Sequence, residues 1–366
     1  MKIQQLTFTR FIAALAIVIY HYGMGSYLFN NTYISFIFQQ ANIGVSYFFM
    51  LSGFVMIIAY GNLENINFFQ YIKNRLARIY PLYVLAVILI AGASLFKNVS
   101  FVDIILHLSM MQTWIPEKAT IINPPGWSLS VELFFYLIFP LLANKFYSKL
   151  KLKTNTIWII LFWLISQIIC NIVLNEIGNI RDPNTKNIHY PLTHLNEFLI
   201  GNLAGLFYMK YLKNQYENYS IPIIIFQLLL IVILKFPIGL NLHNGLLAII
   251  FIPLILLISL SNDKITKLFA RREFVFLGEI SFGIYLLQVP VWLIFSDYRL
   301  EKYFGLDKEA DFTLSFFIRL VILISLSTLT YLFFEKPMKK IIQRTYKKSE
   351  QSEQSEQSPL ARPSIS

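Results

Sequence analysis

The chain has 366 residues, of which 56% are hydrophobic and only 14% are charged. Apolar runs of membrane-spanning length recur from Arg10 to Phe334, which excludes a water-soluble enzyme, and they are too continuous for the alternating strands of a membrane β-barrel. The net charge of +11 could suggest a nucleic-acid partner, but the basic residues are distributed as in a membrane protein. We therefore predict an all-α polytopic membrane protein that binds no nucleic acid.

The apolar runs predict about ten transmembrane helices in a single membrane domain, residues 1–340. The predicted helices cover residues 10–29, 41–60, 79–96, 127–147, 155–175, 193–212, 220–235, 244–261, 277–296 and 313–334. If the N-terminus is cytoplasmic, 22 of the 31 lysines and arginines fall on the cytoplasmic side and eight on the outer loops. This asymmetry predicts a multi-pass protein of the inner (plasma) membrane, in contact with its lipids, with both termini in the cytoplasm.

The two ends of the chain carry their own signals. Lys2 and Arg10 before an apolar run could form a cleavable secretory signal, but nine further spans favour a retained signal-anchor. Residues 341–366 contain three Ser-Glu-Gln triplets and cannot bury enough apolar area to fold, so we expect a disordered cytoplasmic tail. Cys170 is the only cysteine, so no internal disulfide is possible.

The first predicted span contains Arg10 and, eleven residues later, His21. This spacing returns to nearly the same helical face, ~16 Å further along the axis. With Arg10 at the inner edge, His21 lies near the midplane, where an ionisable group is a functional candidate. Apart from His194 at the very start of the sixth span, His21 is the only histidine inside a predicted span, and we expect a neutral imidazole that accepts a proton as a general base.

The second span and the loop after it add two further polar features. Ser52 lies ~16 Å below the outer edge and precedes Gly53; the alternative is that this Ser-Gly pair serves only helix packing. Arg75 and Arg78, three residues apart, place two guanidiniums on one helical face at the cytoplasmic lip. They can clamp a phosphate, or they can anchor the protein to anionic lipid.

The fourth span opens with Trp127 at the outer interface and continues through Ser130 to Glu132. Glu132 lies ~8 Å into the hydrocarbon, where a carboxylate must be protonated, paired or facing a wet cavity. We expect Glu132 to hydrogen-bond the hydroxyl of an acceptor substrate. The alternative is a structural pair with Arg319.

The ninth span contains Ser281, Tyr285 and Gln288, followed by Pro290. Gln288 falls near the midplane, one turn before a proline that can kink or open the helix. We expect these residues to support a site at this depth, although Gln288 can equally form an ordinary hydrogen bond between helices.

Together these stretches resemble the acyltransferase-3 family of integral membrane acyltransferases over nearly all of residues 1–340. The matching features are Arg10 with His21, the stretch around Ser52, Arg75 with Arg78, residues 127–132, residues 281–290, and Phe334-Glu335-Lys336-Pro337 at the end of the last helix. The resemblance implies an enzyme that passes an acyl group, usually acetyl, from cytoplasmic acyl-CoA to a hydroxyl of a cell-envelope or secreted carbohydrate. Acyl-CoA is then a co-substrate, and no cofactor is permanently bound.

This resemblance and the span positions assign candidate roles. The catalytic residues are His21 and Glu132, with His21 acting as a general base or as a transient acyl carrier. Arg10, Arg75 and Arg78 hold the phosphates of CoA while its pantetheine arm reaches toward His21. The supporting polar residues are Ser52, Ser130, Ser281, Tyr285 and Gln288.

The chain departs from the family pattern at Gln288, where the family usually has a histidine, so a two-histidine mechanism is not expected here. No hydrolase-like domain follows the last helix, so the resemblance implies a stand-alone acyltransferase. His189, His194 and Glu197 match no metal-ligand spacing, and we assign no metal.

Asp103 and His107, four residues apart on a short outer stretch, predict a local pair.

Two alternative functions stay open. A transporter or exporter of a glycan or anion would use the same polar residues without acyl transfer. A purely structural membrane subunit is disfavoured by the polar groups at one depth.

Overall fold

The computed structural model describes residues 3–61, 65–94, 99–176, 189–236 and 239–343. Within these ranges the chain is predominantly helical and contains no β-strand, which confirms the predicted all-α fold class. The expected tail falls almost entirely outside the described residues, which end at Gln343, itself in a helical stretch.

The long helices follow the apolar runs. They are α1 (Gln5–Val18), α3 (Gly44–Tyr60), α4 (Phe68–Ser94), α6 (Trp127–Leu141), α7 (Leu152–Glu176), α8 (Leu195–Phe207), α9 (Ser220–Lys235), α10 (Ala248–Leu260), α12 (Arg272–Ile294) and α14 (Phe312–Thr330). Four of them continue into a wider π-helical turn, namely α1 (Ile19–Gly23), α6 (Leu142–Tyr147), α8 (Tyr208–Leu212) and α14 (Tyr331–Glu335). The short helices are α2 (Ser35–Gln39), α5 (Phe101–Leu108), α11 (Lys264–Phe269) and α13 (Asp297–Phe304).

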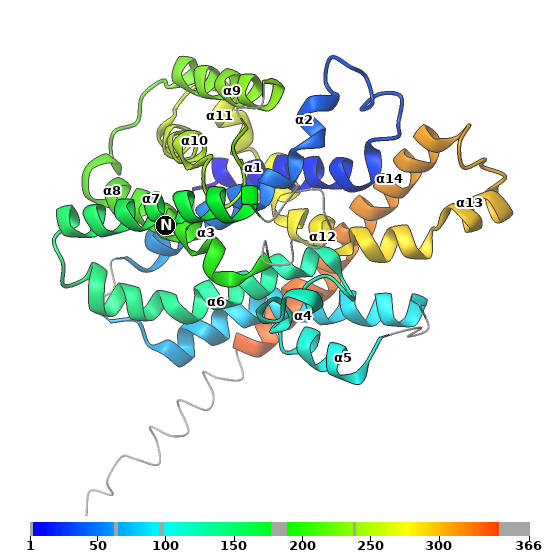
Figure 1. Cartoon of the computed structure of the whole chain (residues 1–366), viewed down its shortest axis with the longest axis horizontal. Helices are drawn as coiled ribbons and strands as arrows, with labels where there is room; N and C mark the ends of the chain where they lie inside the picture. Colours follow the sequence, from blue (N-terminus) through cyan, green and yellow to red (C-terminus); the bar gives the residue numbers. More distant parts are fainter. Residues whose placement is uncertain (1–2, 62–64, 95–98, 177–188, 237–238, 344–366) are drawn as a thin grey trace, which may run out of the picture.

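Seven helical segments among the described residues are long and apolar enough to cross a membrane. Two shorter apolar helices, α9 and α10, lie beside each other at one edge of the bundle (Figure 1). The predicted count of about ten spans therefore stays a prediction, while the multi-pass character of the chain agrees with these helices.

The predicted start of two helices was wrong. α1 begins at Gln5 and its helical run ends at Gly23, whereas the sequence pattern suggested 10–29. α4 begins at Phe68, so Arg75 and Arg78 lie inside this helix and not in the loop before it. The physical reason is that these charged side chains face an internal cavity instead of lipid, and the helix also accommodates Pro81. The other boundaries differ by a few residues.

Most long helices run in roughly the same direction across the bundle (Figure 1). We call the end at which α1 begins the N-terminal face and the opposite end the far face. On the N-terminal face, Asn144 hydrogen-bonds the backbone of Ile66, which ties the end of α6 to the start of α4. On the far face, the hydroxyl of Thr313 accepts from the backbone of Tyr27, which joins the region after α1 to the start of α14.

Two helix pairs pack so closely that glycine is required at the contact. A Cβ on Gly53 of α3 would lie 2.2 Å from the carbonyl oxygen of Phe198 on α8, and one on Gly201 would lie 2.1 Å from that of Met50. A Cβ on Gly278 of α12 would lie 1.9 Å from the carbonyl oxygen of Thr7 on α1. Such close approach is the usual role of small residues in membrane helices, and here it sets α1 directly against α12.

Candidate functional site

Three cavities follow one another through the helix bundle, because neighbouring cavities share lining residues. The vestibule opens at the N-terminal face, has a volume of about 730 Å³ and is lined by Arg75 and Lys336 among others. The arginine cavity, of about 90 Å³, shares Arg10 and Arg78 with the vestibule. The histidine cavity, of about 230 Å³ and lined by His21, shares Tyr285 with the arginine cavity.

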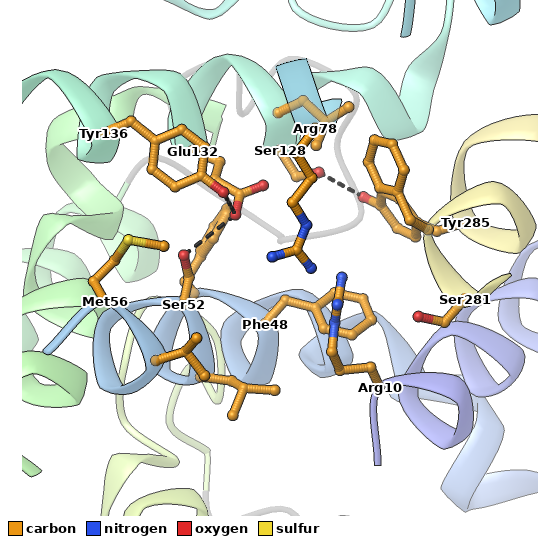
Figure 2. Close-up of a pocket in the computed structure, with 15 residues that line it drawn as sticks. Arg10, Phe48, Ser52, Met56, Arg78, Ser128, Glu132, Tyr136, Ser281 and Tyr285 are labelled. Carbon is orange, nitrogen blue, oxygen red and sulfur yellow. Dashed lines mark hydrogen bonds between the residues drawn. The ribbon is translucent and has the colours of Figure 1, made fainter. Parts of the chain in front are cut away.

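The vestibule is strongly basic. Its acidic lining residues are Glu279 and Glu335, while its basic lining residues are Arg10, Arg75, Arg78, Lys336, Lys339 and Lys340. The guanidiniums of Arg10 and Arg78 point toward each other where the vestibule meets the arginine cavity (Figure 2). Two like charges held close together repel, and Glu132 on the wall of the arginine cavity offsets only one of them, so this arrangement suits a phosphorylated ligand.

Arg75 is held differently from Arg78. Its Nη2 donates to the hydroxyl of Tyr60 at 2.6 Å, and its guanidinium lies over the rings of Tyr60, Tyr71 and Tyr136 at 4.9 to 5.9 Å from their centroids. These contacts fix the side chain at the vestibule wall and shield it from lipid. Of the two arginines predicted to act together, only Arg78 lines both the vestibule and the arginine cavity.

Glu132 lies on the wall of the arginine cavity, where its Oε1 accepts from Ser52 Oγ at 3.2 Å and from Tyr136 Oη at 2.5 Å. Figure 2 shows this cluster beside the paired arginines. Glu132 is not among the residues that line the histidine cavity. The alternative partner Arg319 is engaged elsewhere, since it donates to Asp297 Oδ1 and to the carbonyl oxygen of Phe295.

Tyr285 forms the partition between the arginine and histidine cavities. It is buried, its hydroxyl donates to the carbonyl oxygen of Pro125 at 3.0 Å, and it lies 2.9 Å from Ser128 Oγ. The Ser128–Tyr285 contact ties α6 to α12 at this point (Figure 2). A ligand that passes from one cavity to the other must pass these two hydroxyls.

His21 is oriented by Gln288. The amide Nε2 of Gln288 donates to the carbonyl oxygen of Tyr285 at 2.6 Å, so its Oε1 faces His21 Nδ1, 2.8 Å away. Because Oε1 can only accept, Nδ1 of His21 must carry the proton. Nε2 of His21 is then left with a lone pair, which is the arrangement required of a base. The ring is exposed to the histidine cavity.

The histidine cavity lies toward the far face and is lined by histidines from two connections as well as by His21 of α1. His189 and His194 come from the segment before α8, and His243 comes from the segment between α9 and α10. His194 Nδ1 is 2.7 Å from the buried carboxylate of Glu197, and the ring of Trp127 contacts both His189 and His194. Among the described residues, no group of three His, Cys, Asp or Glu side chains could hold a metal ion.

The remaining predicted site residues divide between the cavity and the surrounding structure. Ser281 lines the arginine cavity and donates to the carbonyl oxygen of Gly278. Ser130 does not reach these cavities; it is buried against Thr113 and the carbonyl oxygen of Met110, where it ties α6 to the preceding turns.

The predicted pair of Asp103 and His107 was wrong, because each of these side chains contacts Lys118 instead. Its ammonium lies 2.8 Å from Asp103 Oδ1, and its carbonyl oxygen lies 3.2 Å from His107 Nε2. Hydrogen bonds from Lys118 and Ser100 lower the pKa of Asp103 to about 2, so this carboxylate is ionised at neutral pH.

Sequence reasoning missed several cavity residues. Lys339 and Lys340 were counted only among the cytoplasmic charges, and Lys336 also in the match at residues 334–337, although their spacing of three and four residues places all three on one helical face. His243 was not considered, and His189 and His194 were set aside because their spacing fits no metal. Their proximity to the predicted outer end of a span was the available signal, since outer connections meet over the far face.

Comparison with known proteins agrees with this arrangement. The model of a family described as an acyltransferase domain matches residues 3–333. The acyltransferase MdmB of Streptomyces mycarofaciens is 34% identical over 153 residues, 38% of this chain and 39% of that protein. The O-acetyltransferase OatA of Staphylococcus aureus is 23% identical over 361 residues, 90% of this chain and 56% of that protein. The chain thus spans about half the length of these relatives or less. No solved structure matches it significantly.

Proposed function

Because the chain belongs to the acyltransferase-3 family, we propose that it transfers an acyl group, most simply acetyl, from cytoplasmic acyl-CoA to a hydroxyl of a cell-envelope or secreted carbohydrate. One observation carries this proposal: a basic vestibule at one face and an oriented histidine in a cavity toward the other are separated by a single partition at Tyr285. The donor then enters from the N-terminal face, which is cytoplasmic in this proposal, and the acceptor from the far face.

The basic residues of the vestibule supply what the nucleotide of CoA requires. Its phosphates cannot enter hydrocarbon, but they can remain in the vestibule against Arg78, Arg10 and the lysines of the last helix. The narrow arginine cavity suits the thin pantetheine arm better than the nucleotide. The thioester at the end of this arm is carried toward Tyr285 and the histidine cavity.

The chemical step uses the free lone pair of His21. Nε2 accepts the proton of the acceptor hydroxyl while the oxygen of that hydroxyl forms a bond to the thioester carbonyl carbon. The carbon–sulfur bond then breaks, and the CoA thiolate leaves and takes up the proton. Gln288 keeps the Nδ1 proton in place throughout, so it acts as a positioning residue in the position where the family usually has a histidine.

The test uses the purified full chain in lipid nanodiscs with acetyl-CoA labelled in its acetyl group and a glycan extract of the envelope. We expect labelled acetyl on glycan and free CoA in equal amounts. A transporter would move glycan or anion across a vesicle membrane without releasing CoA, and that result would overturn the proposal. A variant with His21→Ala provides the matched control for non-enzymatic transfer.

A further inference from the structure

The lining of the histidine cavity differs in charge from the lining of the vestibule. Apart from His21, its polar walls come from the far-face ends of three helices and from the connections between them, including Asn42, Trp127, His189 and His243. No lysine, arginine, aspartate or glutamate lines it among the described residues, in contrast to the vestibule with its six basic side chains. The two ends of the passage therefore differ in their charged lining residues.

Several polar groups on this wall face the cavity. Oδ1 of Asn42 is buried and has no hydrogen-bond partner in the described chain. The imidazoles of His189 and His243 are partly buried and line the same cavity. Buried polar groups are normally satisfied, so the Asn42 oxygen indicates a hydrogen-bond donor in the cavity, and the imidazoles of His189 and His243 can bind the same ligand.

The charge state of these imidazoles follows from their surroundings. Burial, with repulsion from His194 and His243, lowers the pKa of His189 to about 4. Burial, with repulsion from His194, lowers the pKa of His243 to about 4. Both rings are therefore neutral at pH 7, and each offers one donor and one acceptor, as a hydroxyl does.

We propose that the histidine cavity is the acceptor subsite and that it takes an uncharged glycosyl residue, with Asn42, His189 and His243 hydrogen-bonding its hydroxyls beside the indole of Trp127. This inference rests on the proposed function. The volume of about 230 Å³ is below the ~300–1,000 Å³ of pockets for drug-sized ligands, so one sugar ring enters and the rest of the glycan stays outside. One hydroxyl of that ring then faces Nε2 of His21.

A charged ring is excluded for a physical reason. A carboxylate or ammonium group entering this cavity would lose its hydration, and this loss is costly because the ionisable His194 at the wall is already paired with Glu197. Uncharged hydroxyls exchange hydrogen bonds with water for hydrogen bonds with the wall at little net cost. The cavity therefore discriminates by rejecting charge as well as by binding hydroxyls.

The experiment compares acceptors that differ only in charge. Acetyl transfer from labelled acetyl-CoA by the full chain in nanodiscs is measured with the methyl glycosides of glucose, galactose and mannose, with their uronates and with their 2-amino derivatives. We expect kcat/KM for at least one neutral glycoside to exceed that of its charged counterparts by about tenfold or more. A uronate or amino sugar that is used as well as the best neutral ring would overturn the proposal.

Variants locate the effect in the cavity. His243→Leu should raise the KM for the neutral glycoside roughly 2- to 13-fold, the loss expected for one neutral hydrogen bond, with the Kd for acetyl-CoA unchanged. Asn42→Asp should shift preference toward the 2-amino glycoside. His107→Gln is the matched control, because His107 lies outside the cavity and should leave acceptor KM unchanged. An equal rise in KM in this control would also contradict the assignment.

An error in the acceptor subsite and an error in the proposed function give different results. If envelope glycan is acetylated but no neutral glycoside is used, and His243→Leu leaves the KM for the envelope glycan unchanged, the proposed acceptor subsite is wrong and the proposed function stands. If acetyl-CoA is not consumed with any acceptor, including the envelope extract, the proposed function itself is wrong.

Discussion

Replacing Gln288 by leucine removes the group that fixes the His21 ring in one tautomer, and we expect it to lower kcat. Gln288 is fully buried, and leucine has a similar size, so the change opens little empty volume. What His21 loses is the hydrogen bond of 2.8 Å from its Nδ1; the bond that Gln288 donates to the carbonyl oxygen of Tyr285 is lost as well but does not touch the His21 ring. A neutral hydrogen bond is worth ~0.5–1.5 kcal/mol, which corresponds to a fall in kcat of about 2- to 13-fold.

The assay separates orientation from folding. Initial rates of CoA release are measured at saturating acyl-CoA with varied acceptor, and binding of acyl-CoA is measured separately by calorimetry. Gln288→Leu should reduce kcat and leave the Kd for acyl-CoA unchanged. Gln288→Glu keeps an acceptor for the Nδ1 proton and should recover activity relative to leucine. Wild-type kcat in Gln288→Leu, or equal losses in both variants, would refute the orienting role.

Four further predictions concern the N-terminal side and topology. Arg78→Gln should raise the Kd for acyl-CoA by about 13- to 160-fold, since a charge-assisted hydrogen bond is worth ~1.5–3 kcal/mol, and titration calorimetry measures this. Arg75→Gln should cost less, because this guanidinium already donates to tyrosine. Glu132→Gln should tighten acyl-CoA binding in the same assay, because it removes the acidic side chain of the arginine cavity. A reporter active only outside the cytoplasm should be silent after Lys340 and active at Thr120.

Each of these predictions has its own control and contradiction. Arg271→Gln changes an exposed arginine outside the vestibule and should leave the Kd for acyl-CoA unchanged. Equal losses in Arg75→Gln and Arg78→Gln would contradict the distinction drawn between the two. Weaker acyl-CoA binding in Glu132→Gln would indicate a structural role for that carboxylate. A reporter signal after Lys340 would overturn the proposed topology.

The helices themselves were largely predictable, because apolar runs of spanning length leave the chain few alternatives. The start of α4 was not, since the polar stretch that contains Arg75 and Arg78 has the composition of a loop. Only the cavity formed by other helices makes those charges acceptable inside a helix. Helical spacing gives the relative positions of residues on one helix, but it gives neither the rotation of that helix nor its partner.

The same limit applies to the site. His21 and Gln288 are 267 positions apart, and their contact depends on the close packing of α1 and α12 at Gly278. Depth estimates placed Glu132 near the acceptor, whereas the rotation of α6 turns it toward the paired arginines. Ser130, two residues earlier, consequently points to another side of the helix and packs against the turn at Thr113.

The central claim is that His21 accepts the proton of the acceptor hydroxyl, and the most direct measurement is acyl transfer by His21→Ala beside its binding of acyl-CoA. We predict that His21→Ala binds acyl-CoA with unchanged affinity, because His21 does not line the vestibule or the arginine cavity. We predict a fall in the turnover of this variant of ~10²–10⁴, the usual contribution of a general base. Turnover within about tenfold of wild type, a change below ~1.4 kcal/mol, would contradict it.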